Sequence, residues 1–512
     1  MKCKKFLYTL ATGLLLLIGM NAHASEFVWA ESAGGSSFDS GNGIALDGDG
    51  NSYVTGVFQE TTSFGGTPLT SNGSGDMFIA KYDPDGTLIW AKSAGGTSLD
   101  VGRGIAVDSD GNSYITGHFF FSANFGDTTL TADGGNNIFI VKYDPDGMLI
   151  WAKSGEGNGN LDGRSIVVDD SRNSYVTGDF FGTAIFGNTT FISSGSTDIL
   201  IAKYDPDGML IWAKSAGGIS SDQGNGIAVD GDGNSYITGF FGEIVSFGDT
   251  TLTSSGSLDI LIAKYSPDGT LIWAKNAGGT FRDDSKGIAV DDDGNSHVTG
   301  FFDGTASFGD TTLTSNGSRE FFIAKYDSTG MLIEVQRAGG TGSHEGNAIA
   351  LDGDGNSYIT GKYQGEASFG DTTLTSNGNG STDIFIVKLA AVAPNPVIGA
   401  PTNLSGTGCP PDADSIQSYL IPGLETLVFT QHDVGKAGGL VAESGETWKS
   451  SCNFTLPISK PPGKIINHIS LQWGGTSEGI PPNLDASTCL METRPAHGKP
   501  GNLIMVRKHL LR

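Results

Sequence analysis

Three oxygen-bearing side chains recur at a spacing of two residues, as in "VDGDGNSYITG" (229–239). There Asp230, Asp232 and Asn234 have the spacing with which a calcium-binding loop begins. The same letters suit a plain β-hairpin, because Asp-Gly between two apolar runs is a strong turn signal. The motif therefore has two possible meanings, a metal site or a turn.

The chain contains six copies of this motif, and comparing them favours the turn. Five copies are complete: Asp47/Asp49/Asn51, Asp108/Asp110/Asn112, Asp230/Asp232/Asn234, Asp291/Asp293/Asn295 and Asp352/Asp354/Asn356. The third reads Asp169-Asp170-Ser171-Arg172-Asn173 and lacks the middle carboxylate. An EF-hand loop also needs glycine at position six and glutamate at position twelve, which these copies lack. We predict turns closed by the first Asp and no cofactor, with weak calcium binding at some loops as the alternative.

The motif belongs to a longer repeat with a period of 61 residues. Five tryptophans are spaced by this period, Trp29, Trp90, Trp151, Trp212 and Trp273, and Glu334 holds the sixth place. The string N-S-[YH]-[VI]-T-G recurs at the same interval from Asn51 to Asn356. Such self-similarity is the signature of a repeat architecture.

One unit contains four short strands, A to D, as the second copy shows. Residues 104–108, 113–120, 138–143 and 148–154 are apolar, β-branched or aromatic runs. Tight Asp-Gly turns join A to B and C to D, and longer links join B to C and D to A. Strands with apolar residues on both faces suit the blade of a β-propeller, whose neighbouring blades pack face to face.

The two ends of the array predict a closed ring. The array opens with a lone strand D at 27–32 and ends with a strand C at 383–389 that has no strand D after it. Pairing of 28–31 beside 384–388 would complete the last blade and remove a sheet edge. The predicted fold is all-β: a six-bladed β-propeller of 61-residue four-stranded blades, closed by the N-terminal strand.

The repeat resembles a known family in these residues. The unit "GIAVDxDGNSYVTG … FIAKYDPDGxLIWAKSAGG" is similar to the bacterial β-propeller repeat abbreviated SBBP, and its A–B hairpin resembles the NHL-type hairpin. The resemblance covers about residues 26–389 and recurs six times. It implies an exported or cell-surface protein, often without a known activity, and propellers host many unrelated functions.

Two further positions recur in the blades. Strand C carries a lysine in each unit, at Lys81, Lys142, Lys203, Lys264, Lys325 and Lys388. We interpret this as a structural ion pair with a neighbouring blade. The tryptophan of strand D is expected to pack between blades, and Glu334 to leave its junction looser.

The candidate binding site lies on the face formed by the D–A and B–C links, here called the long-loop face. Variable loops on a rigid scaffold are where binding usually occurs. The residue just before each inner strand should lie near the mouth of the central channel: Asn42, Arg103, Arg164, Asn225, Lys286 and Asn347. Three basic and three amide side chains there would bind an anion or a sugar acid. The alternative is that they satisfy nearby loop backbone and carboxylates.

The first functional hypothesis is an exported, non-catalytic binding or cell-surface scaffold module. Its partner would be a protein, a glycan or a small anionic ligand on the long-loop face. The alternative is a calcium-dependent hydrolase of the lactonase type with its site in the channel. Gluconolactonase-like propellers imply a Glu, Asn and Asp calcium set, and this chain has no Glu at the matching positions. His118, His297 and His344 occupy unlike places in their blades, and we find no nucleophile elbow, zinc motif or phosphate loop.

Residues 1–24 are predicted to be a secretory signal peptide. Lys2, Lys4 and Lys5 precede an apolar run at 7–20, and Ala22-His23-Ala24 offers a cleavage site. The expected location is therefore extracellular, cell-surface or periplasmic, without a membrane span. The net charge is −26, and residues 25–399 carry −29, which would repel nucleic acid.

The C-terminal part has a different composition. The predicted organisation is a β-propeller at 25–389, a Pro/Gly/Ser linker at 390–411 and a region of unknown type at 412–512, β-rich or partly disordered. Strand-like runs occur at 426–430 and 465–473. In an oxidising compartment two of Cys409, Cys452 and Cys489 could pair, and the sequence leaves open which two.

Overall fold

The computed structural model describes residues 29–376 and 382–390 with their side chains, and the backbone of seven strands beyond them. The predicted signal peptide lies outside the described residues. The chain divides into two compact units, Met1–Leu389 and Ala390–Arg512. The described residues form strands and no helix, so none of them belongs to a helix that could cross a membrane.

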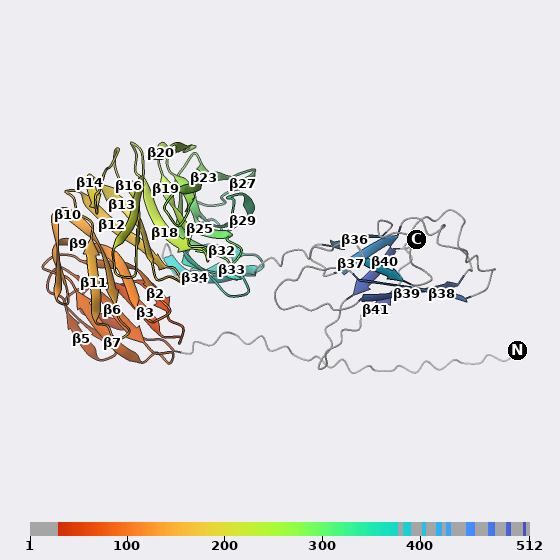
Figure 1. Cartoon of the computed structure of the whole chain (residues 1–512), viewed down its shortest axis with the longest axis horizontal. Coiled ribbons are helices and arrows are strands. Elements are labelled where there is room, and N and C mark those ends of the chain that lie inside the picture. The colour runs from red at the N-terminus through yellow and green to blue at the C-terminus, as the bar shows by residue number, and fades with distance from the viewer. Residues whose placement is uncertain are drawn as a thin grey trace. The chain divides into compact units, whose positions relative to one another are not determined.

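The first unit consists of six repeated antiparallel sheets, which we call blades 1 to 6, and they follow one another around a common centre (Figure 1). Blade 1 consists of β2(Asp39–Leu46), β3(Ser52–Phe58), β6(Asp76–Tyr82) and β7(Leu88–Ala94). Blade 2 consists of β8(Val101–Val107), β9(Ser113–Phe125), β10(Thr128–Tyr143) and β11(Leu149–Ser154). Blade 3 consists of β12(Asn160–Val168), β13(Ser174–Phe181), β16(Asp198–Tyr204) and β17(Leu210–Ala216). Blade 4 consists of β18(Gln223–Val229), β19(Ser235–Phe241), β22(Asp259–Tyr265) and β23(Leu271–Gly279). Blade 5 consists of β24(Asp283–Val290), β25(Ser296–Phe302), β28(Glu320–Tyr326) and β29(Leu332–Ala338). Blade 6 consists of β30(His344–Leu351), β31(Ser357–Gln364) and β34(Thr382–Leu389). The four strands predicted for each unit are thus present in blades 1 to 5.

Each blade also has a hairpin that the sequence analysis took for a polar link. It lies between the second and third strands: β4(Thr61–Phe64) and β5(Thr67–Thr70), β14(Thr183–Phe186) and β15(Thr189–Ile192), β20(Ile244–Phe247) and β21(Thr250–Thr253), β26(Thr305–Phe308) and β27(Thr311–Thr314), β32(Glu366–Phe369) and β33(Thr372–Thr375). In blade 2 the hairpin is continuous with the long strands β9 and β10. Its Gly-Asp-Thr-Thr turn is a hairpin signal that we had assigned to a loop.

The hydrophobic core is divided among the junctions between blades. One buried cluster joins Ile138 and Ile140 of β10 to Leu161 and Ile166 of β12, and similar clusters lie at the other junctions from blade 1 to blade 6. Every residue of β16 and β22 is buried. Strands that are covered on both faces are what packed propeller blades require.

The repeated tryptophan fastens each blade to the next one, as predicted. Trp151 lies in β11, the last strand of blade 2. Its Nε1 donates a hydrogen bond to Pro206 O at 3.1 Å, in the turn between β16 and β17 of blade 3. Gly208 in this turn has φ +75°, and a Cβ there would lie 2.8 Å from the indole ring. Glycine is therefore needed here for two reasons: the turn requires a positive φ, and the indole ring leaves no room for a side chain. Glu334 stands where the following blade has no such described turn.

The N-terminal segment follows the path of a strand D and its link. Trp29 Nε1 donates to Pro84 O at 3.0 Å, as the other tryptophans do to the turn of their next blade. β1 (Ala33–Gly35) pairs with β4, as the corresponding link residues Gly278 and Gly279 pair with β26. Both contacts place this segment where the last strand of a blade preceding blade 1 would lie.

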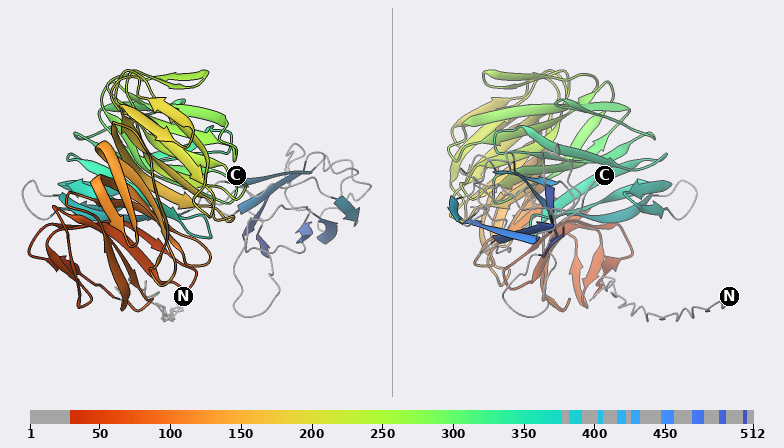
Figure 2. Two further views of the ribbon diagram at one scale, coloured as in Figure 1. Left: turned by 60° about the vertical axis from the view of Figure 1, so that its left-hand side comes forward. Right: turned by 90° about the vertical axis from the view of Figure 1, so that its right-hand side faces the viewer.

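The predicted closing strand itself is not observed among the described residues. Blade 6 is a three-stranded sheet, and 29–32 form no strand. Blades 1 and 6 consequently expose apolar side chains on the faces that would meet. The two blades are the red and the teal ribbons in the views of Figure 2. Ile44 is 66% exposed and Ile386 75%, whereas their counterparts Ile105 and Ile201 are 8% and 0% exposed. We call these two faces the seam.

The second unit contains two small antiparallel sheets. One has the order β35(Thr402–Ser405), β38(Thr447–Thr455) and β39(Ile469–Thr476); the other has β36(Ile416–Ile421), β37(Thr426–Gln431), β40(Thr488–Glu492) and β41(Met505–Arg507). β37 contains the strand-like run predicted at 426–430, and β39 overlaps the run predicted at 465–473 in residues 469–473. The cysteine side chains for which we considered a disulfide lie outside the described residues.

Candidate functional site

The repeated Asp-x-Asp-Gly-Asn segments close hairpins, as predicted. Asp230 Oδ1 accepts hydrogen bonds from the backbone of Asp232 at 3.1 Å and Asn234 at 2.8 Å, and Oδ2 accepts one from Tyr236 OH at 3.0 Å. Gly233 N donates to Asp230 O at 2.9 Å, which closes the turn. Burial acts to raise the pKa of Asp230, but the hydrogen bonds from Asn234 hold it below its usual value. The acceptor oxygens of this Asp are therefore used by the hairpin itself.

The recurring lysine of strand C pairs within its own blade. Lys264 Nζ lies 3.4 Å from Asp230 Oδ2, and the same pair recurs in the other blades at 3.0–3.9 Å. The next blade supplies a backbone carbonyl, because Lys203 Nζ donates to Pro267 O at 3.4 Å. Our expectation of an ion pair between neighbouring blades is thus wrong. The first Asp of the blade's own turn lies beside strand C and is the carboxylate that pairs with the lysine.

The six residues predicted at the mouth share one structural feature. In each blade the pairing of the first two strands shifts at this position, for example between Gly41 and Gly43, which makes the residue a β-bulge. The bulged residues are Asn42, Arg103, Arg164, Asn225, Lys286 and Asn347. Bulges take a side chain out of the strand's alternation and are frequent beside functional sites. The innermost strands β2, β8, β12, β18, β24 and β30 lie side by side, so their bulges form one belt.

In blades 2 and 3 the basic residues of the belt meet on one carboxylate. Asp162 Oδ1 lies 2.9 Å from both Arg103 Nε and His118 Nδ1, and Asp162 Oδ2 lies 3.5 Å from an Arg164 nitrogen. Arg164 also pairs with Asp179. Burial acts to raise the pKa of Asp162, but His118 and the two guanidinium groups hold it below its usual value. This part of the belt is a network of ion pairs rather than a positive surface.

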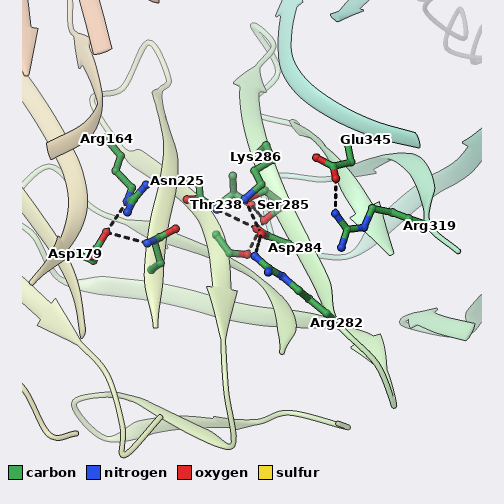
Figure 3. A network of polar contacts seen from close by, with 12 residues as sticks. Arg164, Asp179, Asn225, Thr238, Arg282, Asp284, Ser285, Lys286, Arg319 and Glu345 are labelled. Atoms are coloured by element: carbon green, nitrogen blue, oxygen red, sulfur yellow. Dashed lines mark hydrogen bonds and ion pairs between the residues drawn. The ribbon is translucent and has the colours of Figure 1, made fainter. Parts of the chain in front are cut away.

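A second network centres on Asp284, which is fully buried (Figure 3). Lys286 Nζ lies 2.6 Å and an Arg282 nitrogen 3.1 Å from Asp284 Oδ2. Asn225 Nδ2 donates to Asp284 Oδ1 at 2.9 Å and to Ser285 O at 2.9 Å. The bulges of blades 4 and 5 are thereby joined through one carboxylate.

The network continues into blade 6 (Figure 3). Arg319 pairs with Glu345 and lies 3.2 Å from Asp303 Oδ1. Lys362 Nζ lies 3.0 Å from the other oxygen of Glu345. Burial acts to raise the pKa of Glu345, but Lys362 and Arg319 hold it below its usual value. Asp303, Arg319 and Lys362 were not singled out in the sequence.

The structure thus brings four of the six predicted residues into these networks. Asn42 instead donates to Gly102 O of the next blade at 2.8 Å, and Asn347 is exposed. The missed partners had a sequence signal: the position two before the bulge carries Asp162, Asp284 and Glu345 in three blades. Asp162 and Asp284 pair with basic bulges of the same or the preceding blade, whereas Glu345 pairs with Arg319 and Lys362.

A separate set of carboxylates is buried in pairs at three junctions between blades. The pairs are Asp76 with Asp100, Asp198 with Asp222, and Asp259 with Asp283, each 3% exposed or less. The first member of each pair has one oxygen, Oδ1, that accepts no hydrogen bond from a described residue. Burial raises the pKa of Asp198 to about 6 and that of Asp222 to about 7. Burial disfavours the charged form of both groups, so each takes up a proton more readily than an ordinary aspartate.

The other two junctions replace these acid pairs by neutral or paired groups. One junction has Asn137 and Leu161 at the same two positions. At the other, Glu320 lies 2.5 Å from an Arg337 nitrogen, opposite His344. At these two junctions an amide with an apolar residue, or an ion pair beside a histidine, takes the place of the two carboxyl groups.

Within the part of the chain that the structure describes, no three His, Cys, Asp or Glu side chains gather as ligands of one metal ion. The arrangement on the long-loop face is instead a belt of guanidinium, ammonium and carboxylate groups held by bulges. Its chemistry is that of hydrogen bonding and charge recognition.

Comparison with known proteins identifies the class. Three segments, residues 30–57, 89–118 and 211–239, match the model of the β-propeller repeat SBBP. The resemblance stated from the sequence is confirmed at these three places. The chain is therefore a β-propeller repeat protein.

Two curated proteins are similar over most of this chain. An uncharacterized WD repeat-containing protein, L264, of Acanthamoeba polyphaga mimivirus is 25% identical over 71% of this chain and 33% of its own length. The regulatory protein FlaEY of Caulobacter vibrioides is 23% identical over 66% of this chain and 39% of its own length. The chain therefore spans only 33–39% of the length of these relatives.

Solved structures with a similar course of the chain share little sequence with it. One is XC5397 from Xanthomonas campestris, described as a gluconolactonase, with 15% identity, a TM-score of 0.31 and coverage of 63% of this chain and 82% of that one. Another is Sqt1 from Chaetomium thermophilum, with 9% identity, a TM-score of 0.35 and coverage of 87% and 89%. We take no function from either likeness.

Proposed function

We propose that the chain is an exported, non-catalytic binding propeller that takes an acidic saccharide or another small anion at the belt of bulged residues on its long-loop face. The observation that carries this proposal is that one bulge in each blade puts partly exposed basic and amide side chains on adjoining inner strands. The side chains of Arg103 and Arg164 are 35% and 26% exposed. Their guanidinium groups keep donors beyond those used by Asp162 and Asp179, and a planar donor fork suits a carboxylate.

The proposed site needs a rigid support, and we propose that the ring supplies it by closing at the seam. The exposed faces of blades 1 and 6 are the two halves of the interface that is buried at the five other junctions. Trp29 and β1 already occupy the positions of a preceding blade's last strand. With 27–32 beside β34, the sheet edge would be covered and Ile44 would face Ile386.

Closure can be tested by placing a charge at the seam. In a closed ring Ile44→Asp buries an unpaired carboxylate and lowers the free energy of unfolding by ~3–5 kcal/mol, as Ile105→Asp does at an ordinary junction. The measurement is urea unfolding of both variants, followed by circular dichroism. A neutral Ile44→Asp beside a strongly destabilised Ile105→Asp would show that the seam is open in solution.

Export rests on the sequence of residues 1–24 alone. Expression of the full chain in a bacterial host, followed by fractionation and N-terminal sequencing, tests it. Cleavage after Ala24 and recovery outside the cytoplasm is the expected result. Retention of uncleaved protein in the cytoplasm would remove this part of the proposal.

Binding is tested with the full mature chain on an array of acidic and neutral saccharides. We expect binding of at least one acidic saccharide, which weakens about tenfold or more in Arg103→Ala/Arg164→Ala. Arg172→Ala is the matched control, because Arg172 pairs with Asp110 in the turns of the opposite face. Undiminished binding by the double variant would reject the belt as the site. Calcium-dependent hydrolysis of a sugar lactone by the wild type would favour the hydrolase instead.

A further inference from the structure

Blade 5 departs from the repeat at several positions of the long-loop face. At the position of Arg282 the other blades carry Phe38, Leu99, Asn160, Ser221 and Ser343. At the position of Arg319 the preceding blades carry Gly75, Asn136, Thr197 and Leu258. The bulge of the same blade is Lys286. Two arginines and a lysine are thus found together in blade 5. The repeated fold does not require these residues, so they are candidates for a binding site.

These three cations surround a single aromatic ring. The Phe301 centroid lies 3.7 Å from the Arg319 guanidinium carbon, 5.7 Å from that of Arg282 and 5.9 Å from Lys286 Nζ. Phe301 itself is 1% exposed. Like charges that converge on one ring repel one another, so the arrangement needs anions to hold it.

The anions that hold it lie beneath the cations. The side chain of Asp284 is fully buried and that of Glu345 is 9% exposed, whereas those of Arg282 and Arg319 are 45% and 25% exposed. With buried carboxylates below and partly exposed guanidinium groups above, the cluster keeps nitrogen donors that can reach a ligand in solvent. Such preorganised donors bind an incoming anion without the cost of ordering long side chains.

The charges of this cluster do not cancel. Arg282, Lys286, Arg319 and Lys362 are paired with only Asp284, Asp303 and Glu345, which leaves one positive charge. The whole chain carries −26, so a long polyanion would be repelled around the cluster while a single carboxylate would match its excess.

An exposed aromatic residue directly precedes the cluster in the chain. Phe281 is 58% exposed, and a Cβ at Gly304 would lie 2.7 Å from its ring, so the ring rests on glycine backbone. It is the immediate neighbour of Arg282 in the chain. An aromatic face next to a guanidinium group offers an apolar surface for the C–H face of a sugar and donors for its charged substituent.

We propose that Phe281, Arg282, Lys286 and Arg319 form the subsite that recognises a sugar carrying one carboxylate, a uronic acid, with the carboxylate on the two arginines and the sugar ring on Phe281. This subsite deepens, and rests on, the proposed binding of an acidic saccharide at the belt. Blades 4 to 6 would then read the charge of the ligand, and the Asp162 network would contact the remainder.

The test uses the full mature chain and isothermal titration with D-glucuronate, D-galacturonate and D-mannuronate, each beside its neutral parent sugar. We expect at least one uronate to bind at least tenfold more tightly than its parent. Arg282→Gln and Arg319→Gln should each reduce uronate affinity about 10- to 100-fold and leave that of the parent sugar unchanged. Phe281→Ala should weaken both sugars. Arg172→Gln on the opposite face is the control, and unchanged thermal unfolding shows that each variant is folded.

The outcomes separate this inference from the proposed function. If a saccharide binds and depends on Arg103 and Arg164, but Arg282→Gln and Arg319→Gln bind it as the wild type does, the belt stands and the blade 5 subsite is rejected. If the uronate binds no better than its parent, charge recognition at blade 5 is rejected as well. If no saccharide binds on the array or in titration, the proposed function falls and the subsite with it.

Discussion

The buried acid pairs predict that the propeller is more stable in mild acid than in mild alkali. A carboxyl group whose pKa is raised by folding destabilises the folded chain most at a pH where it is ionised in both the folded and the unfolded chain. Asp198, with a pKa of about 6 against an ordinary 3.8, is protonated in the folded chain and ionised in the unfolded chain between these values. Folding therefore takes up a proton, and stability falls as the pH rises through this window.

The magnitude follows from the width of the window. Each such group gives a slope of ~1.4 kcal/mol per pH unit, so Asp198 alone accounts for at most ~3 kcal/mol, lost by pH 7. Asp222, with a pKa of about 7, extends the pH window over which stability falls. The neutral Asn137 shows that an amide is tolerated at the position of Asp198.

The decisive variant is therefore Asp198→Asn, measured by urea unfolding from pH 4 to pH 8. The amide imitates the protonated acid, since its oxygen can still accept from Ser194 N and its nitrogen can donate toward Asp222. We expect stabilisation of ~2–3 kcal/mol at pH 8, little change at pH 4 and a flatter pH dependence between them. Asp207→Asn in an exposed turn is the control and should leave the profile unchanged. Equal destabilisation of Asp198→Asn at both ends, or wild-type stability that rises from pH 5 to pH 8, would refute proton uptake by Asp198 on folding.

Three other predictions concern the turns and the junctions. Trp151→Ala, which removes the indole and its bond to Pro206, should lower the free energy of unfolding by ~3–5 kcal/mol, whereas Glu334→Ala at the equivalent place should change it by less than ~1 kcal/mol; similar losses in both would contradict the role of the tryptophan. Arg172→Gly should change stability by no more than ~1 kcal/mol, because relief of its φ of +66° offsets an exposed ion pair; a large loss in urea unfolding would show that this ion pair matters more than its exposure suggests. Addition of millimolar calcium to chelator-treated protein should leave the melting temperature unchanged, because the oxygens of Asp230 are already used; a large upward shift would mean that the loops or another site bind the metal.

Much of the fold could be predicted because the same local signals occur six times. Asp-Gly turns, apolar runs and a constant interval define strands and their order without any knowledge of contacts. The accessory hairpin was missed because its first strand has only four residues and its second, Thr-rich strand is mostly exposed. The hairpin therefore lacks the longer apolar run by which the other strands were recognised. The closing strand was predicted from the count of strands, and the observed positions of Trp29 and β1 agree with it in part.

The site could be predicted only in position. The sequence placed these residues just before the inner strands, whereas they lie within the strands as bulges. Their charge balance depends on residues of the next blade, such as Asp162 beside Arg103. A contact between residues about 60 positions apart has no local signature, and only its repetition or its absence in one blade gives a hint. Blade 5 gave such a hint through Arg282 and Arg319, which a comparison of all six units position by position would have found.

The likeness of the junctions has a consequence for assembly. The outward face of any blade fits the inward face of any other, so the packing itself scarcely distinguishes the native order from a permuted one. Order within one molecule is imposed by the short connections, but two molecules at high concentration can exchange blades. Ion pairs that cross only one junction, such as Arg172 with Asp110 or Arg319 with Glu345, then disfavour wrong neighbours.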